Sequence, residues 1–128
     1  MIVLVTGGVK NGKSKFAEEL CSKISRGKMC YIATMYRNDN DIEVAERINN
    51  HRIMRKGRGF DTFEKMTSIN DLSVDKYDTA LLECLTNLLA NEMFMTKDGF
   101  ENSFSKITEG IKAISSQVNN LIIISNDI

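Results

Sequence analysis

The chain has 128 residues, of which 42% are hydrophobic and 27% are charged. These values are typical of one soluble globular domain with a single core. Seventeen basic residues balance seventeen acidic ones, so the net charge gives no reason to expect nucleic acid or an anionic membrane as a partner. The N-terminal apolar run is short and continues into a glycine-rich loop, which indicates a core strand rather than a signal peptide or integral membrane segment.

The apolar pattern predicts alternating strands and helices in one domain over residues 1–128. In chain order, we expect a strand at 2–6, a helix at 13–25, a strand at 29–33, a helix at about 42–55, a loose segment to about 76, a strand at 79–82, a helix from 85, a helix over 100–118 and a strand at 121–124. Apolar strands that alternate with helices predict an α/β fold, a P-loop NTPase-like, mainly parallel sheet with helices on both faces.

Three details of this pattern carry further expectations. The helix over 100–118 has an apolar stripe that should point inward, formed by Phe100, Phe104, Ile107, Ile111, Ile114 and Val118. Cys21, Cys30 and Cys84 all lie in apolar stretches; an odd count without a C-x-x-C pair predicts buried, reduced thiols and a cytoplasmic protein. The last strand ends where parallel sheets place a ligand-binding loop, so we expect the domain to be incomplete at its C-terminal end.

Residues 7–14 read Gly-Gly-Val-Lys-Asn-Gly-Lys-Ser and match the phosphate-binding P-loop G-x-x-x-x-G-K-[ST]. A predicted strand precedes the motif and a predicted helix follows it, which is the context it requires. Glycines let backbone N–H groups turn onto a phosphate, and the helix N-terminus adds partial positive charge. Lys13 is expected to reach the β/γ-phosphates, and the Ser14 hydroxyl to bind Mg²⁺. We therefore expect a nucleoside triphosphate to contact Gly7, Gly8, Val9, Lys10, Asn11, Gly12, Lys13 and Ser14.

His51 is the only histidine, and it shares a helical stripe with Arg47 and Arg55 at i, i+4 and i+8. Val44 and Ile48 lie beside this stripe and could anchor the helix on the core. Flanking guanidinium groups disfavour a further positive charge and so favour the neutral, nucleophilic imidazole. The same arginines could bind phosphates in a bidentate manner. The alternative is a solvated basic face with an incidental histidine, and the spacing alone favours that alternative.

Glu83 stands at the carboxyl end of a strand that is predicted to be buried. A carboxylate at this position suits the second element of a P-loop site, which helps to hold Mg²⁺ or its water ligands. The alternative is a carboxylate that caps the next helix, and the sequence is equally compatible with both roles.

These features together resemble the bifunctional adenosylcobinamide kinase / adenosylcobinamide-phosphate guanylyltransferase family of cobalamin biosynthesis, the CobU type. Besides the P-loop, the resemblance rests on Tyr-Ile-Ala-Thr at 31–34, the arginine-histidine-arginine pattern at 47–55, Phe-x-Thr-x-Glu at 60–64, Leu-Glu-Cys-Leu-Thr at 82–86 and Ser-Asn-Asp at 125–127. The P-loop is shared by many families, whereas the arginine-histidine-arginine spacing after Tyr-Ile-Ala-Thr is far more specific.

The resemblance implies two reactions that use ATP or GTP with Mg²⁺. Lys13 would assist γ-phosphoryl transfer to the aminopropanol hydroxyl of adenosylcobinamide. His51 would then take GMP from GTP and pass it to the phosphorylated cobinamide, giving adenosyl-GDP-cobinamide. Because members of this family form homotrimers, the resemblance also implies a homotrimer. By the same resemblance, Ser14 and Glu83 would hold the metal, and the nucleotide site would also include Ala33, Thr34, Met35, Arg52, Ile53, Met54, Arg55, Glu64 and Glu83.

The chain departs from the family pattern in three places. Asn11 stands where serine is usual, and Asn50 replaces a histidine that is common before the guanylylated one. The glycine-rich loop, proline and helix that family chains carry after Ser-Asn-Asp are not in this sequence. Two other functions therefore stay open: a truncated, weakly active or non-catalytic nucleotide-binding module, and another small-molecule P-loop kinase.

Overall fold

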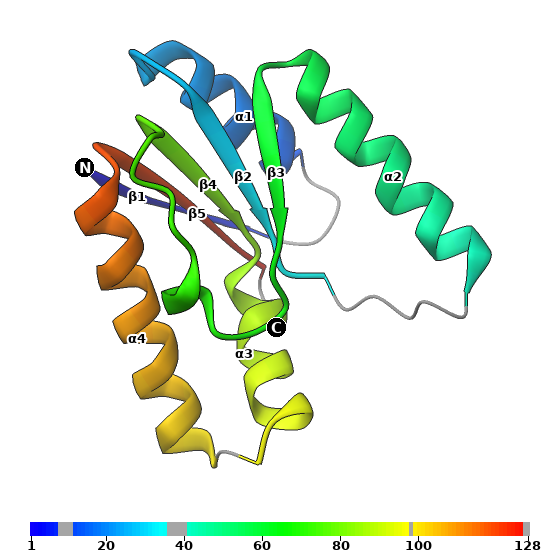
Figure 1. Ribbon diagram of the computed structural model, residues 1–128, viewed down its shortest axis with the longest axis vertical. Coiled ribbons are helices and arrows are strands. Elements are labelled where there is room, and N and C mark those ends of the chain that lie inside the picture. The colour runs from blue at the N-terminus through cyan, green and yellow to red at the C-terminus, as the bar shows by residue number, and fades with distance from the viewer. Residues whose placement is uncertain (8–11, 36–40, 98, 127–128) are drawn as a thin grey trace.

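The computed structural model describes residues 1–7, 12–35, 41–97 and 99–126. Within these ranges the chain forms five strands, four α-helices and one short 3₁₀ helix (Figure 1). The strands are β1 (Ile2–Gly7), β2 (Met29–Ala33), β3 (Phe60–Glu64), β4 (Thr79–Glu83) and β5 (Asn120–Asn126). The helices are α1 (Lys13–Ile24), α2 (Ile42–Gly57), η1 (Ile69–Asp71), α3 (Leu85–Met95) and α4 (Phe100–Gln117).

The strands form one sheet in the order β1-β5-β4-β2-β3, and every neighbouring pair is parallel. In Figure 1, α1 lies behind this sheet, α3 and α4 lie in front of it, and α2 lies beside the β3 edge. Helices on both faces follow from the connections, because each parallel strand needs a crossover back to the start of the sheet. The predicted parallel α/β fold is confirmed, and its strands converge at their carboxyl ends beside the start of α3.

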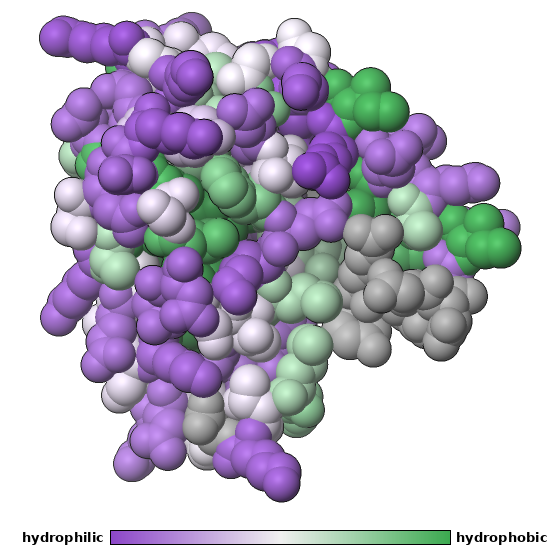
Figure 2. All heavy atoms as spheres, in the orientation of Figure 1, coloured by the Kyte–Doolittle hydropathy of each residue, from purple (hydrophilic) through white to green (hydrophobic). Residues whose placement is uncertain are grey.

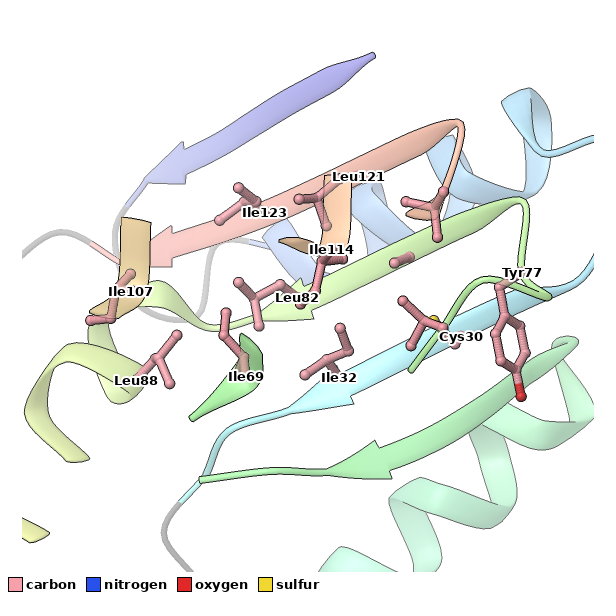
Figure 3. Packing of buried hydrophobic residues seen from close by; sticks show 13 residues of the cluster. Cys30, Ile32, Ile69, Tyr77, Leu82, Leu88, Ile107, Ile114, Leu121 and Ile123 are labelled. Atoms are coloured by element: carbon pink, nitrogen blue, oxygen red, sulfur yellow. The ribbon is translucent and has the colours of Figure 1, made fainter. Parts of the chain in front are cut away.

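Consecutive residues on the central strands point to opposite faces, as the two-residue period of a strand requires. Each face therefore has its own apolar cluster, and the cluster beneath α3 and α4 is drawn in Figure 3. The front cluster includes Cys30, Ile32, Leu82, Leu88, Ile107, Ile114, Leu121 and Ile123. The back cluster includes Ala17, Cys21, Tyr31, Phe60, Leu81, Cys84, Ile122 and Ile124. All three cysteines are buried and unbridged, as the sequence predicts.

The segment between 57 and 76, which was expected to be loose, contains β3 and η1. β3 reads Phe-Asp-Thr-Phe-Glu, and it was missed because polar residues interrupt it. The polar residues are explained by its place at the edge of the sheet, where Asp61 and Glu64 are exposed while Phe60 is buried. The other expected elements differ from the observed ones by at most two residues at either end.

The predicted inward stripe of α4 is wrong at its N-terminal end. Phe100 and Phe104 are 58% and 60% exposed. The buried face is instead formed by Ser103, Ile107, Gly110 and Ile114. Gly110 on this face lets η1 pack directly against α4, and Ile69 of η1 lies over it. The close packing of η1 thus sets the rotation of α4 about its axis, although this leaves the larger apolar side chains Phe100 and Phe104 exposed.

The outer surface is mixed in character. Hydrophilic residues cover most of the face shown in Figure 2, and the apolar ones form separate patches. Among the described residues, none of the helices has the length and apolar character that crossing a membrane would require.

Candidate functional site

A cleft of about 630 Å³ opens at the carboxyl ends of the strands, between α1 and α2. This is where parallel sheets bind ligands, and the volume lies within the range that small-molecule sites occupy. Its walls come from several elements that are distant in sequence. The lining residues are Ser14, Glu18, Tyr31, Ala33, Met35, Ile48, His51, Met54, Arg55, Arg58, Glu64, Met66, Glu83, Cys84, Asn87 and Asn126.

Ser14 and Glu83 meet inside this cleft. The Ser14 hydroxyl, on the first turn of α1, donates a 2.6 Å hydrogen bond to Oε1 of Glu83 at the end of β4. Burial raises the pKa of Glu83 and the hydrogen bond from Ser14 lowers it, while nearby Glu18 raises it and Lys13 lowers it. A hydroxyl and a carboxylate side by side are oxygen donors suited to a hard divalent cation. No cluster of three or more histidine, cysteine or acidic side chains occurs in the described ranges to hold one.

The start of α1 has the backbone form that the glycine loop predicts. Gly12 has φ +82°, in the left-handed region that glycine adopts without strain. It provides no side-chain cap, and the first turn of α1 carries no acidic residue. A helix N-terminus carries partial positive charge, which favours an anion at this end of α1. Lys13 is 8% exposed at the same point. The predicted phosphate-contacting residues Gly8, Val9, Lys10 and Asn11 lie outside the described residues.

Helix α2 presents one face to the cleft. It begins after Asp41, whose Oδ1 accepts hydrogen bonds from the backbone N–H groups of Glu43 and Val44. Its cleft-lining residues include His51, Met54 and Arg55. Arg47, which shares the predicted stripe, is exposed and does not line the cleft. The sole histidine is therefore brought to the same cleft as Ser14 and Glu83.

Arg55 is the one buried residue of α2. Its guanidinium Cζ lies 4.1 Å from the centre of the Tyr31 ring, and its Nε donates a 3.2 Å hydrogen bond to Thr62 Oγ1. Burial lowers the pKa of Arg55, and nearby Glu18 and Glu64 partly oppose this change. These contacts fasten the C-terminal half of α2 to β2 and β3.

The cleft holds carboxylates as well as arginines. Glu18 of α1 forms a 3.0 Å ion pair with Arg58, which follows α2. Sequence reasoning missed both residues. Glu18 was detectable in principle, because it lies four residues after Ser14 and so shares its helix face. Nothing local distinguishes Arg58 or Asn87, since each reaches the cleft only through the tertiary fold.

Seven of the nucleotide-site residues implied by the resemblance line the cleft. These are Ser14, Ala33, Met35, Met54, Arg55, Glu64 and Glu83. Several others do not: Gly7, Gly12, Lys13, Thr34, Arg52 and Ile53 are absent from the lining. Thr34 is completely buried. Arg52 and Ile53 are exposed elsewhere on α2 because the helical repeat turns them away from the face that carries His51 and Arg55.

The chain is similar in fold to the flagellar accessory protein FlaH from Methanocaldococcus jannaschii, with a TM-score of 0.54 over 98% of this chain and 60% of that one. At 12% identity this likeness concerns the fold alone.

Two curated relatives share more of the sequence. Both are named bifunctional adenosylcobalamin biosynthesis protein CobU. That of Escherichia coli (strain K12) is 34% identical over 119 residues, and that of Salmonella typhimurium (strain LT2) is 33% identical over 96. The matches cover 88% and 73% of this chain but only 63% and 51% of the relatives. The model of the cobinamide kinase / cobinamide phosphate guanyltransferase family matches residues 3–128, so the chain belongs to this family.

Proposed function

We propose that this cleft binds a nucleoside triphosphate with Mg²⁺ and serves two steps of cobalamin biosynthesis. The first is phosphorylation of adenosylcobinamide. The second is transfer of GMP from GTP to the phosphorylated product through His51. One observation carries the proposal: in a member of this family, His51 lines the same cleft as the hydrogen-bonded pair Ser14 and Glu83.

The phosphorylation step needs positioning and charge neutralisation rather than covalent chemistry. Lys13 and the N–H groups at the start of α1 would bind the phosphates, and Ser14 and Glu83 would hold Mg²⁺. The metal, when bound, neutralises charge on the phosphates. The aminopropanol hydroxyl of adenosylcobinamide then attacks the γ-phosphorus and releases its proton to solvent. The bond to the β-phosphate oxygen breaks, and the nucleoside diphosphate leaves.

The guanylyl transfer needs a nucleophile, and an imidazole such as that of His51 can serve in that role. A ring nitrogen of His51 would attack the α-phosphorus of GTP, and pyrophosphate would leave. The resulting phosphorus–nitrogen bond would then be broken by a phosphate oxygen of the cobinamide phosphate, which frees the imidazole. Two easier displacements thus replace one difficult displacement.

Intact-mass spectrometry after incubation with Mg²⁺ and GTP tests the role of His51. We expect an acid-labile GMP adduct on the wild type and on Asn50→Ala, an exposed neighbour on α2 that does not line the cleft. We expect no adduct on His51→Ala. An unmodified wild type that is folded, or an adduct that persists in His51→Ala, contradicts the proposal.

Phosphoryl transfer to cobinamide tests the role of Lys13. Lys13→Ala should slow transfer by about 100-fold, as expected for loss of one charge-stabilising group. Lys15→Ala, at an exposed position on the same helix, should not. Equal rates for Lys13→Ala and the wild type would remove Lys13 from the mechanism.

A second candidate function is nucleotide binding without turnover. The observation that favours it is the exposed position of His51 on α2, which suits an incidental histidine on a solvated face. This candidate predicts saturable binding of Mg²⁺–GTP with neither a GMP adduct nor transfer to cobinamide.

A further inference from the structure

Asn91 is a buried amide whose contacts link strand ends at the cleft. It lies on α3 and is 7% exposed. Its Nδ2 donates hydrogen bonds of 2.7 Å to the carbonyl oxygen of Thr34 and 2.9 Å to that of Met66. These two carbonyls come just after β2 and β3, beyond the last ladder pair Ala33–Glu64. One side chain therefore holds the two strands together where their own ladder has ended.

Thr34 continues this connection to β4. Its backbone N–H donates to the carbonyl oxygen of Glu83 at 3.0 Å. Its hydroxyl accepts from the N–H of Cys84 at 2.8 Å and lies 3.1 and 2.9 Å from the carbonyl oxygens of Glu83 and Cys84, to which it can donate. Thr34 is completely buried and does not line the cleft. It thus fixes the main chain at the carbonyl of Glu83 and at the following residue, Cys84.

The orientation of the Glu83 side chain depends on that main chain. Its carboxylate must reach Ser14 on a different element, and the contact distance is 2.6 Å. A displacement of a group in such a site by about 1 Å can lower the reaction rate by up to about 100-fold. Hydrogen bonds connect Asn91 to Thr34, Thr34 to Glu83 and Glu83 to Ser14, and so lead from the core of the front face to the cleft.

We propose that Asn91, acting through Thr34, is a positioning residue that aims the Glu83 carboxylate at the metal position beside Ser14. This inference rests on the proposed function, because it assumes that Ser14 and Glu83 hold Mg²⁺. In this proposal, Thr34 supports nucleotide binding indirectly, through Glu83, and not by contact with the nucleotide.

The inference is tested by measuring GTP affinity calorimetrically in Mg²⁺ and in EDTA. A positioning residue for Glu83 affects only the gain in affinity that Mg²⁺ provides. A residue that merely stabilises the fold alters both affinities together or neither. We expect Asn91→Ala to reduce the Mg²⁺-dependent gain by about tenfold and to leave the affinity in EDTA unchanged.

The matched control is Gln117→Ala. Gln117 also joins two backbone groups, accepting from the N–H of Val74 at 2.7 Å and donating to the carbonyl oxygen of Leu72 at 3.2 Å. It lies at the end of α4, which precedes the start of β5, away from the cleft. Gln117→Ala should lower stability by a comparable amount and preserve the gain in affinity from Mg²⁺.

A second pair of variants keeps the test decisive if Asn91→Ala does not fold. Thr34→Val preserves shape and removes the hydroxyl, so it should lose the same Mg²⁺-dependent gain, whereas Thr34→Ser should recover it. Normal Mg²⁺ dependence in folded Asn91→Ala or Thr34→Val overturns the inference and leaves the proposed function standing. A wild type that binds GTP equally well with and without Mg²⁺ overturns both.

Discussion

Replacing Gly110 by alanine has two opposite effects on the free energy of unfolding, and the approximate size of each is known. Within an exposed helix, alanine is favoured over glycine by about 1 kcal/mol. Gly110 is buried on α4, however, and an added Cβ would lie 3.0 Å from Cδ1 of Ile69, closer still to its Cγ1, and 3.3 Å from the backbone nitrogen of Asn70. Overpacking of a core costs about 1–3 kcal/mol. The backbone atom limits how far η1 can yield, so we expect the steric cost to exceed the propensity gain.

The net expectation for Gly110→Ala is a loss of about 1 kcal/mol in the free energy of unfolding. Urea titration followed by far-ultraviolet circular dichroism measures it. The pair Glu109→Gly and Glu109→Ala, at an exposed position one residue earlier, provides the propensity difference without the contact. Ile69→Ala removes the obstructing atoms, so the double variant should be more stable than the sum of the single effects predicts. A gain of about 1 kcal/mol in Gly110→Ala would refute the packing of η1 on α4.

The remaining predictions concern charge and reactivity. Burial raises the pKa of Glu83 in the folded state above its ordinary value of 4.5, so its contribution to stability is fully present below that ordinary value and is lost as pH rises through the folded value. Urea midpoints of Glu83→Gln should therefore gain on those of the wild type as the pH rises above 4.5, and parallel profiles would contradict this. Arg55→Lys keeps the charge but loses the hydrogen bond to Thr62 and the contact of the planar guanidinium with the Tyr31 ring. It should therefore lower the free energy of unfolding by about 1–2 kcal/mol. A change below about 0.5 kcal/mol would show that these contacts do not anchor α2. Burial raises the pKa values of Cys21 and Cys30 to about 12, so both thiols should resist iodoacetamide at about pH 8 in the native protein and react in urea, as counted by mass spectrometry. Rapid native labelling at either position would place that thiol outside the core.

The fold class could be predicted because parallel strands that are buried on both faces leave a local signal. Tyr31 to Ile32 and Leu81 to Leu82 form short apolar runs, and each run precedes a segment with helical periodicity. β3 could not be found in this way, because Asp61, Thr62 and Glu64 interrupt its apolar pattern. The rotation of α4 about its axis could not be predicted either. Helical periodicity takes account only of apolar residues, so it does not indicate that Gly110 allows η1 to approach α4 closely.

The strand–loop–helix context of residues 7–14 and the candidates His51 and Glu83 could be recognised from the amino-acid sequence, because they depend on residue type and local spacing. Which of these groups meet depends on the tertiary fold. The Ser14–Glu83 contact joins residues 69 positions apart, and the placement of His51 in the same cleft depends on how α2 lies on β2 and β3 through Arg55. The roles of Thr34 and Asn91 were equally hidden, because hydrogen bonds between strand ends depend on long-range packing, which local sequence spacing does not specify.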